Sequence, residues 1–211
     1  MASSVDCMAI ATNTLSDGEA LPYAARMGQT ADDSALMLRY QDGDLAAFDT
    51  LYRRHNDPLY RYLLRLSQNR DTADDLFQEV WGKIVKTRAR YRPTARFTTF
   101  LYRVAHNCFI DHLRRNKRHA NHAEFKAESH SDPGEQPDAA TERRLAKERL
   151  SKALMDLPEA QRDTFLLHEE AGLSLEQIAA VTGSNRETAK SRLRYAVNKL
   201  RVAIADGSEQ K

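Results

Sequence analysis

Apolar residues recur at three- and four-residue steps in two separate blocks of the chain, and no stretch alternates as a strand would. The first block begins near Ser34, and the second runs from about Thr141 to Ile204. Because this period is that of amphipathic helices, the sequence predicts an all-α protein made of two small helical domains.

The first block predicts three or four helices. The apolar steps over residues 45–66 predict one long helix, with a kink or a break just before Pro58, because proline lacks a backbone N–H donor. Asp71 is expected to cap the next helix. A short loop at residues 91–96 then leads into a helix over about residues 97–115.

The second block carries the signs of a helix-turn-helix, in a winged-helix-like or four-helix domain. Ser174 and Gln177 have the spacing of a capping box, and Ser184 and Glu187 repeat that spacing. Gly183 lies between the two predicted helices. In a helix-turn-helix the second helix enters the DNA major groove, although many solvent-exposed helical hairpins also have a basic outer face.

The remaining segments lack helical periodicity and are rich in polar, Gly and Pro residues. We therefore expect an ordered domain on either side of a flexible acidic linker, preceded by a disordered N-terminal extension and followed by a short tail. The predicted division is 1–33 for the N-terminal extension, 34–118 for the first domain, 119–140 for the linker, 141–205 for the second domain and 206–211 for the tail.

Charge is spread unevenly along the chain. The whole sequence has a formal net charge of +2. Residues 34–118, however, hold 17 Lys and Arg against 9 Asp and Glu. A basic domain of this kind suits a polyanionic partner such as nucleic acid.

Cations alternate with aromatic rings from Arg88 to Arg118. Guanidinium groups attract phosphates, and exposed rings offer a stacking surface to unpaired bases, so this mixture favours strand-separated nucleic acid. The alternative is a buried stripe, because Phe97, Leu101, Val104 and Phe109 fall at helical spacing. Phe100, Tyr102 and Arg103 fall off that stripe.

The residues that build metal and catalytic sites are not arranged as such sites require. Cys7 and Cys108 form no CxxC pattern, and the histidines form no HExxH pattern, so we expect no metal and no disulfide. We find no phosphate loop and no nucleophile–base pairing, and therefore expect neither a cofactor nor an enzyme. No run is long enough to span a membrane, which favours a cytoplasmic protein.

Three segments resemble the extracytoplasmic-function (ECF) sigma factors of bacterial RNA polymerase, in the sigma-70 superfamily. Residues 74–81 look like the family's core-polymerase-binding helix, and residues 97–107 look like its promoter-opening segment, which reads the −10 element. Residues 157–193 look like its −35-reading domain. The three segments occur in the family's order, with a linker between the second and the third.

The resemblance implies roles for individual residues. A surface that faces the polymerase's largest subunit, with the tryptophan ring as an exposed anchor, is implied at Asp75, Leu76, Gln78, Glu79 and Trp81. Contacts with the opened −10 element are implied at Arg96, Phe97, Thr99, Phe100, Tyr102, Arg103 and Asn107. Contacts with the −35 element are implied at Arg186, Thr188, Lys190, Ser191, Arg192 and Arg194.

The resemblance also implies partners, namely core RNA polymerase, promoter DNA and an anti-sigma factor. In the family the linker threads toward the RNA exit path, so the acidic linker here is a candidate RNA mimic, unless its charge serves only solubility. Two other functions stay open. One is a stand-alone helix-turn-helix regulator, and the other is a sigma-like decoy that binds only an anti-sigma factor.

Overall fold

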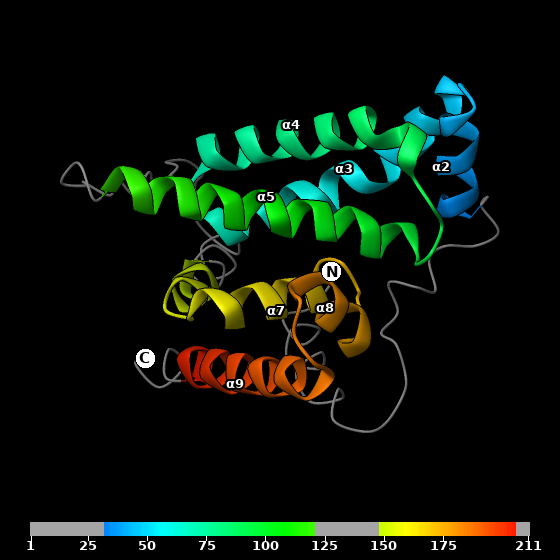
Figure 1. The fold of residues 1–211 in the computed structure, drawn as a ribbon. Helices are drawn as coiled ribbons and strands as arrows, with labels where there is room; N and C mark the ends of the chain where they lie inside the picture. Colours follow the sequence, from blue (N-terminus) through cyan, green and yellow to red (C-terminus); the bar gives the residue numbers. More distant parts are fainter. Residues whose placement is uncertain (1–31, 121–147, 206–211) are drawn as a thin grey trace, which may run out of the picture.

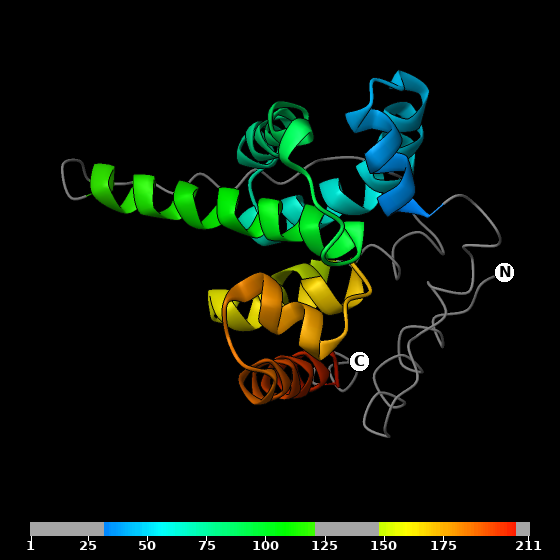
Figure 2. The ribbon, with the colours of Figure 1, turned by 45° about the vertical axis from the view of Figure 1, so that its right-hand side comes forward.

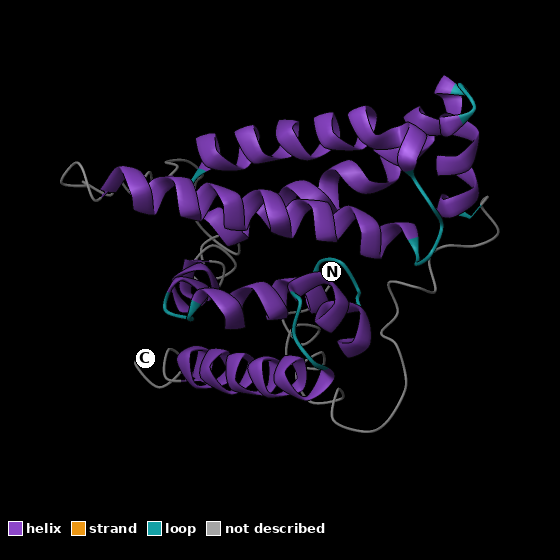
Figure 3. Ribbon diagram, in the orientation of Figure 1, coloured by secondary structure: helices purple, strands orange, loops and turns teal. Residues whose placement is uncertain are grey.

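The computed structural model describes residues 32–120 and 148–205, and every regular element within these ranges is helical (Figures 1 and 3). This confirms the all-α prediction. The N-terminal extension, the linker after Ala120 and the tail lie outside the described residues, as does the candidate RNA mimic. The elements are α2 (Asp33–Gln41), α3 (Leu45–Ser67), α4 (Arg70–Thr87), the 3-10 helix η2 (Arg88–Arg90), α5 (Phe97–Ala120), a helix at 148–155, α7 (Glu159–Glu169), α8 (Leu175–Thr182) and α9 (Arg186–Ala205).

Helices α2 to α5 form the first domain, in which α3, α4 and α5 pack side by side and α2 crosses their end (Figure 1). Pro58 is buried inside α3, which continues without a break from Leu45 to Ser67. The cap of α4 differs from the expectation. Asn69 Oδ1 accepts a hydrogen bond from the Thr72 amide at 2.8 Å, while Asp71 lies in the first turn.

The second domain contains the helix at 148–155 and helices α7, α8 and α9. The capping box at the start of α8 is confirmed, because Ser174 and Gln177 bond each other's backbone amides. Gly183 ends α8 in the left-handed region, at φ 65°. The second predicted box is wrong, since Asn185 Oδ1, rather than Ser184, accepts from the Thr188 amide at 2.7 Å.

The two domains pack directly against each other. Helix α7 contacts α3, and α8 contacts α5, so that α7 and α8 lie between the first domain and α9 (Figures 1 and 2). Leu166 and Leu167 of α7 belong to the same apolar core as the first domain. A smaller core, which includes Leu154, Ala196 and Leu200, joins the helix at 148–155 to α9.

Candidate nucleic-acid and polymerase interface

The start of α5 carries the predicted stacking rings, and two of them are buried. Tyr102 is 2% exposed and packs edge-on against Tyr62 at 5.2 Å between ring centroids. Phe97 and Thr99 are buried as well. The expectation that Tyr102 lies off the buried stripe is wrong, because α5 is covered by α3 and α4 on one side and by α8 on another, which widens its buried face.

Phe100 is only partly buried and borders a cavity of about 680 Å³. Its ring lies 5.2 Å from the ring of Tyr91, and burial raises the pKa of the Tyr91 hydroxyl. Phe100 and Tyr91 therefore form an aromatic wall of this cavity, while Lys83, Arg90 and Arg92 supply cations at its rim. The remaining lining residues are Thr87, Val104, Asn107 and Asp111.

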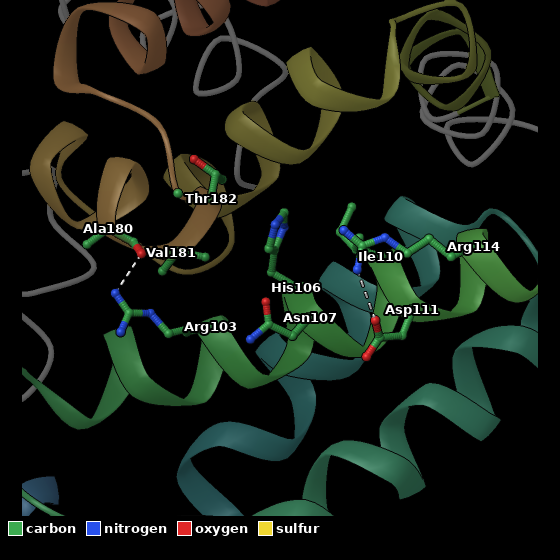
Figure 4. Close-up of a pocket in the computed structure, with 10 residues that line it drawn as sticks. Arg103, His106, Asn107, Ile110, Asp111, Arg114, Ala180, Val181 and Thr182 are labelled. Carbon is green, nitrogen blue, oxygen red and sulfur yellow. Dashed lines mark hydrogen bonds and ion pairs between the residues drawn. The ribbon is translucent and has the colours of Figure 1, made fainter.

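Arg96, Arg103 and Asn107 are exposed, as expected of residues that contact DNA. Arg103 is nevertheless engaged by the second domain, since its Nη2 donates to the Ala180 carbonyl oxygen of α8 at 2.6 Å (Figure 4). A second cavity, of about 510 Å³, lies between α5 and residues 180–183. Asn107 borders both cavities.

The outer face of α4 is acidic. Asp75 and Gln78 are exposed. Glu79 forms ion pairs with Lys83 at 2.8 Å and with Arg115 of α5 at 3.2 Å. Burial opposes the charged form of Glu79, but the hydrogen bonds from these two cations hold the pKa of its carboxyl below the usual value.

The other two residues of the predicted polymerase surface lie in the core. Leu76 is buried, and Trp81 is 6% exposed, with its ring 4.9 Å from that of Tyr52 and 5.8 Å from that of Phe48. The expectation of an exposed tryptophan anchor is therefore wrong. The ring of Trp81 packs against aromatic side chains of α3, and Leu76 belongs to the same buried core.

The outer face of α9 is basic and accessible. Lys190, Ser191 and Arg194 are exposed, and Thr188 and Arg192 are partly exposed. Arg186 forms an ion pair with Glu176 at 2.5 Å and with Glu187 at 3.2 Å. Glu187 thus pairs with a neighbouring cation instead of completing a capping box. All six candidate −35 residues have side chains that solvent reaches.

A polar cluster between the domains was not found by sequence reasoning. Asp163 of α7 is 5% exposed, yet it accepts a hydrogen bond from the Tyr62 hydroxyl at 2.7 Å and lies 2.8 Å from His106 Nδ1. Nearby, Glu170 pairs with Arg61 and Arg65 of α3. The sequence around Asp163 gives no signal of burial, since Arg162 and Thr164 flank it, and its partners lie 57 and 101 residues away.

Within the described ranges, no group of three or more His, Cys, Asp or Glu side chains is placed to hold a metal ion. Among those same residues, no helix is both long and apolar enough to cross a membrane.

A helical domain with a half-open aromatic cavity, followed by a helix-turn-helix with a basic recognition face, defines a class of two-domain helical proteins suited to DNA. Residues 51–119 match the sigma-70 region 2 family, and residues 147–200 match the sigma-70 region 4 family. The chain belongs to the sigma-70 family of RNA polymerase sigma factors, in its ECF group.

Similar proteins cover nearly the same span. The RNA polymerase sigma-H factor of Pseudomonas aeruginosa is 31% identical over 79% of this chain and 92% of its own length. The ECF sigma factor SigF of Caulobacter vibrioides is 33% identical over 82% and 95%, and CarQ of Myxococcus xanthus is 29% identical over 81% and 96%.

Two solved structures share the fold. The sigma factor RpoE of Bartonella quintana, in complex with the anti-sigma factor NepR, matches with a TM-score of 0.65 and 23% identity over 75% of this chain and 96% of that one. CnrH, in complex with the cytosolic domain of CnrY, matches with a TM-score of 0.63 and 21% identity over 82% and 97%.

Proposed function

We propose that this sigma factor guides core RNA polymerase to promoters by reading the −35 element with α9 and by trapping an opened −10 base beside Phe100. The observation that carries the proposal is the cavity at Phe100, where an aromatic wall and a cationic rim coincide. It is a cytoplasmic specificity subunit with no chemistry of its own.

The cavity suits a base that has left the double helix. Moving a base out of the stack costs a few kcal/mol, and stacking on a protein ring returns roughly 1–3 kcal/mol. Phe100 and Tyr91 supply the rings, while Arg90 and Arg92 are positioned to meet the phosphates on either side. Phe97 backs this wall from the core, with its ring 6.2 Å from that of Phe100, and the buried rings of Phe97 and Tyr102 do not touch the base.

The exposed face of α9 suits an intact duplex. Arg186, Lys190 and Arg192 recur along the first half of the helix, the part that reaches base edges in a helix-turn-helix. A guanidinium can donate two hydrogen bonds to one guanine, which discriminates against other bases by about 1–3 kcal/mol.

The acidic face of α4 is the proposed polymerase contact, with Asp75, Gln78 and Glu79 as the accessible residues. Carboxylates here complement a basic helical partner. The matched RpoE structure contains an anti-sigma factor, and we propose that a protein of this kind also restrains the present chain.

Run-off transcription tests the proposal. Core polymerase freed of its own sigma factor is incubated with genomic fragments, with and without the purified chain. Discrete products that require the chain support the proposed function. Binding of the chain to duplex DNA without polymerase, together with no run-off product, would instead favour a stand-alone regulator, and binding to neither DNA nor polymerase would favour a decoy.

Two variants then distinguish the contribution of the −10 contact from that of the −35 contact. Phe100→Ala is expected to slow the appearance of permanganate-reactive thymines at −10, while Lys190→Ala is expected to weaken recruitment to templates that carry the −35 element. Arg53→Ala is the control, because Arg53 is exposed on α3 and its ion pair within the described residues is local, with Asp49 at 3.0 Å.

A further inference from the structure

We propose that His55, held by Asp33, is a positioning residue of the base pocket: its imidazole packs behind the ring of Phe97 and thereby keeps Phe100 where an extruded base can stack on it. This inference rests on the proposed function, because it concerns the same pocket. His55 lies outside the lining of that cavity and is 5% exposed, so it acts through other side chains and not on the base itself.

The two rings of the pocket come from different segments of the chain. Tyr91 follows η2, whereas Phe100 lies in the first turn of α5. The loop between them, residues 92–96, is exposed and supplies little packing that would fix one ring relative to the other. Phe97 is their common neighbour, because its ring lies 6.2 Å from that of Phe100 and 6.5 Å from that of Tyr91. A shift of Phe97 would therefore disturb both rings.

His55 of α3 packs against Phe97. The two ring centroids lie 5.3 Å apart and the ring planes are tilted by 52°, a favourable arrangement for aromatic rings. A buried imidazole also carries polar nitrogens, and burial of such a group costs free energy unless it is hydrogen-bonded. The support of Phe97 therefore depends on a hydrogen-bond partner for His55.

Asp33, at the start of α2, is that partner. His55 Nε2 donates to Asp33 Oδ2 at 2.8 Å, and Arg54 Nη1 donates to Asp33 Oδ1 at 2.7 Å. Burial opposes the charged form of Asp33, but the bonds from His55 and Arg54 lower the pKa of its carboxyl, which stays ionised and accepts both. With one nitrogen fixed in this way, the imidazole cannot turn freely, and its plane toward Phe97 is set.

Helix α2 also holds the segment that carries the other ring. Gln41 Nε2 donates to the Ala89 carbonyl oxygen of η2 at 2.8 Å, and the Arg88 guanidinium lies 5.2 Å over the ring of Tyr40. The Tyr91 amide in turn donates to the Arg88 carbonyl oxygen at 3.1 Å. Because α2 contacts both η2 and α5, it supports the two segments from which the rings of the pocket come (Figure 1).

The alternative is that the buried pair of Asp33 and His55 serves folding alone. The two roles can be separated, because the hydrogen bond and the ring are different parts of one side chain. His55→Gln keeps a nitrogen donor for Asp33, the same number of bonds from the backbone, and removes the ring. His55→Phe keeps a ring behind Phe97 and removes the donor, while Arg54 still pairs with Asp33.

Base extrusion is measured with a fluorescent adenine analogue in the −10 element, with core polymerase and each full-length variant at saturating concentration. His55→Gln is expected to reduce the extruded fraction about 2- to 10-fold, the range expected for the loss of one aromatic pair. His55→Phe is expected to match the wild-type protein. Urea unfolding should show lower stability in both variants, since each loses one interaction, so a purely structural role would impair extrusion in both.

Leu66→Ala is the control for stability, because Leu66 is buried at the opposite end of α3 from His55 and its loss weakens the core away from the pocket. It should lower the urea midpoint and leave extrusion at the wild-type level. Equal impairment in His55→Gln and His55→Phe, or impairment in Leu66→Ala as large as that in His55→Gln, would overturn the positioning role.

A double substitution tests whether His55 acts through Phe100. In the Phe100→Ala background the supported ring is absent, so His55→Gln should cause no further loss of extrusion. An undiminished effect of His55→Gln in that background would overturn the inference, because the imidazole would then act on the base by another route.

A measurement without DNA separates this inference from the proposed function. In protein labelled with 4-fluorophenylalanine, the fluorine resonance of Phe100 is identified by its loss in Phe100→Ala. It should move in His55→Gln and keep its wild-type position in Leu66→Ala. An unmoved resonance in His55→Gln would refute the support of Phe100 by His55. A moved resonance, combined with no extrusion by the wild-type protein, would sustain that support and refute the proposed function instead.

Discussion

Replacing Phe100 by alanine tests the base pocket most directly. The ring contacts Tyr91 at 5.2 Å and Phe97 at 6.2 Å between centroids, and its remaining surface borders the 680 Å³ cavity. Removing it takes away the stacking surface and leaves the rest of α5 in place.

The expected effect follows from what the ring contributes. Loss of stacking is worth about 1–3 kcal/mol per base, which corresponds to a reduction of about 5- to 150-fold in the stability of the opened complex. Because Phe100 is only partly buried, Phe100→Ala should lower the free energy of unfolding by about 1–2 kcal/mol, less than the loss of a fully buried ring. Tyr102→Ala gives the contrast, since truncating a fully buried ring costs about 3–5 kcal/mol of folding stability.

The assay measures opening and folding separately. A fluorescent adenine analogue in the −10 element reports base extrusion, and urea unfolding of the free protein reports stability. Phe100→Ala should impair extrusion at nearly normal stability, with duplex binding retained. Extrusion at the wild-type rate, or a loss of stability as large as that of Tyr102→Ala, would refute the reasoning and return Phe100 to the core.

Four further substitutions have expected outcomes. If Lys190 reads a base edge, Lys190→Ala should weaken binding to a −35 duplex by about 1–3 kcal/mol in a gel-shift titration. If Lys190 contacts a phosphate instead, the substitution should reduce the salt dependence of DNA binding equally for all sequences. Trp81→Ala should lower the free energy of unfolding by about 3–5 kcal/mol, whereas Gln78→Ala should reduce core-polymerase affinity with an unchanged urea midpoint. Burial opposes ionisation of Asp33, but hydrogen bonds from α3 hold the pKa of its carboxyl below the ordinary value of 3.8. The folding stability that ionised Asp33 contributes is therefore present above pH 3.8 and is lost as the pH falls through the lowered pKa. Asp33→Asn should therefore destabilise the protein by about 2 kcal/mol at pH 7, and unfolding curves of the two proteins should converge in strong acid.

The sequence predicted the helices well because their signals are local. The capping box at Ser174 needs only residues three apart, and it forms as expected. The errors at the other caps are equally local. The sequence prediction placed the caps at Asp71 and Ser184, whereas the structure has them at Asn69 and Asn185. All four side chains can accept an amide hydrogen bond.

Burial was harder to predict because it depends on how many neighbours a helix has. The periodicity of α5 indicates one buried face, and Tyr102 lies outside it, but α5 packs against helices of both domains. Trp81 was assigned to the surface by resemblance, and the aromatic residues of α3 that cover it are distant in sequence. The Asp163 contacts join residues 57 and 101 positions apart, beyond the reach of any periodicity.

The contact between α3 and α7 is made within one polypeptide, and this fixes what can compete with it. A tethered surface meets its partner at an effective concentration in the millimolar range, however dilute the protein is in the cell. A lower concentration of the protein in the cell therefore does not weaken the contact between α3 and α7. A partner that binds α3 or α7 at this contact has to offer more binding free energy than the internal neighbour, so the tether sets the threshold for that competition.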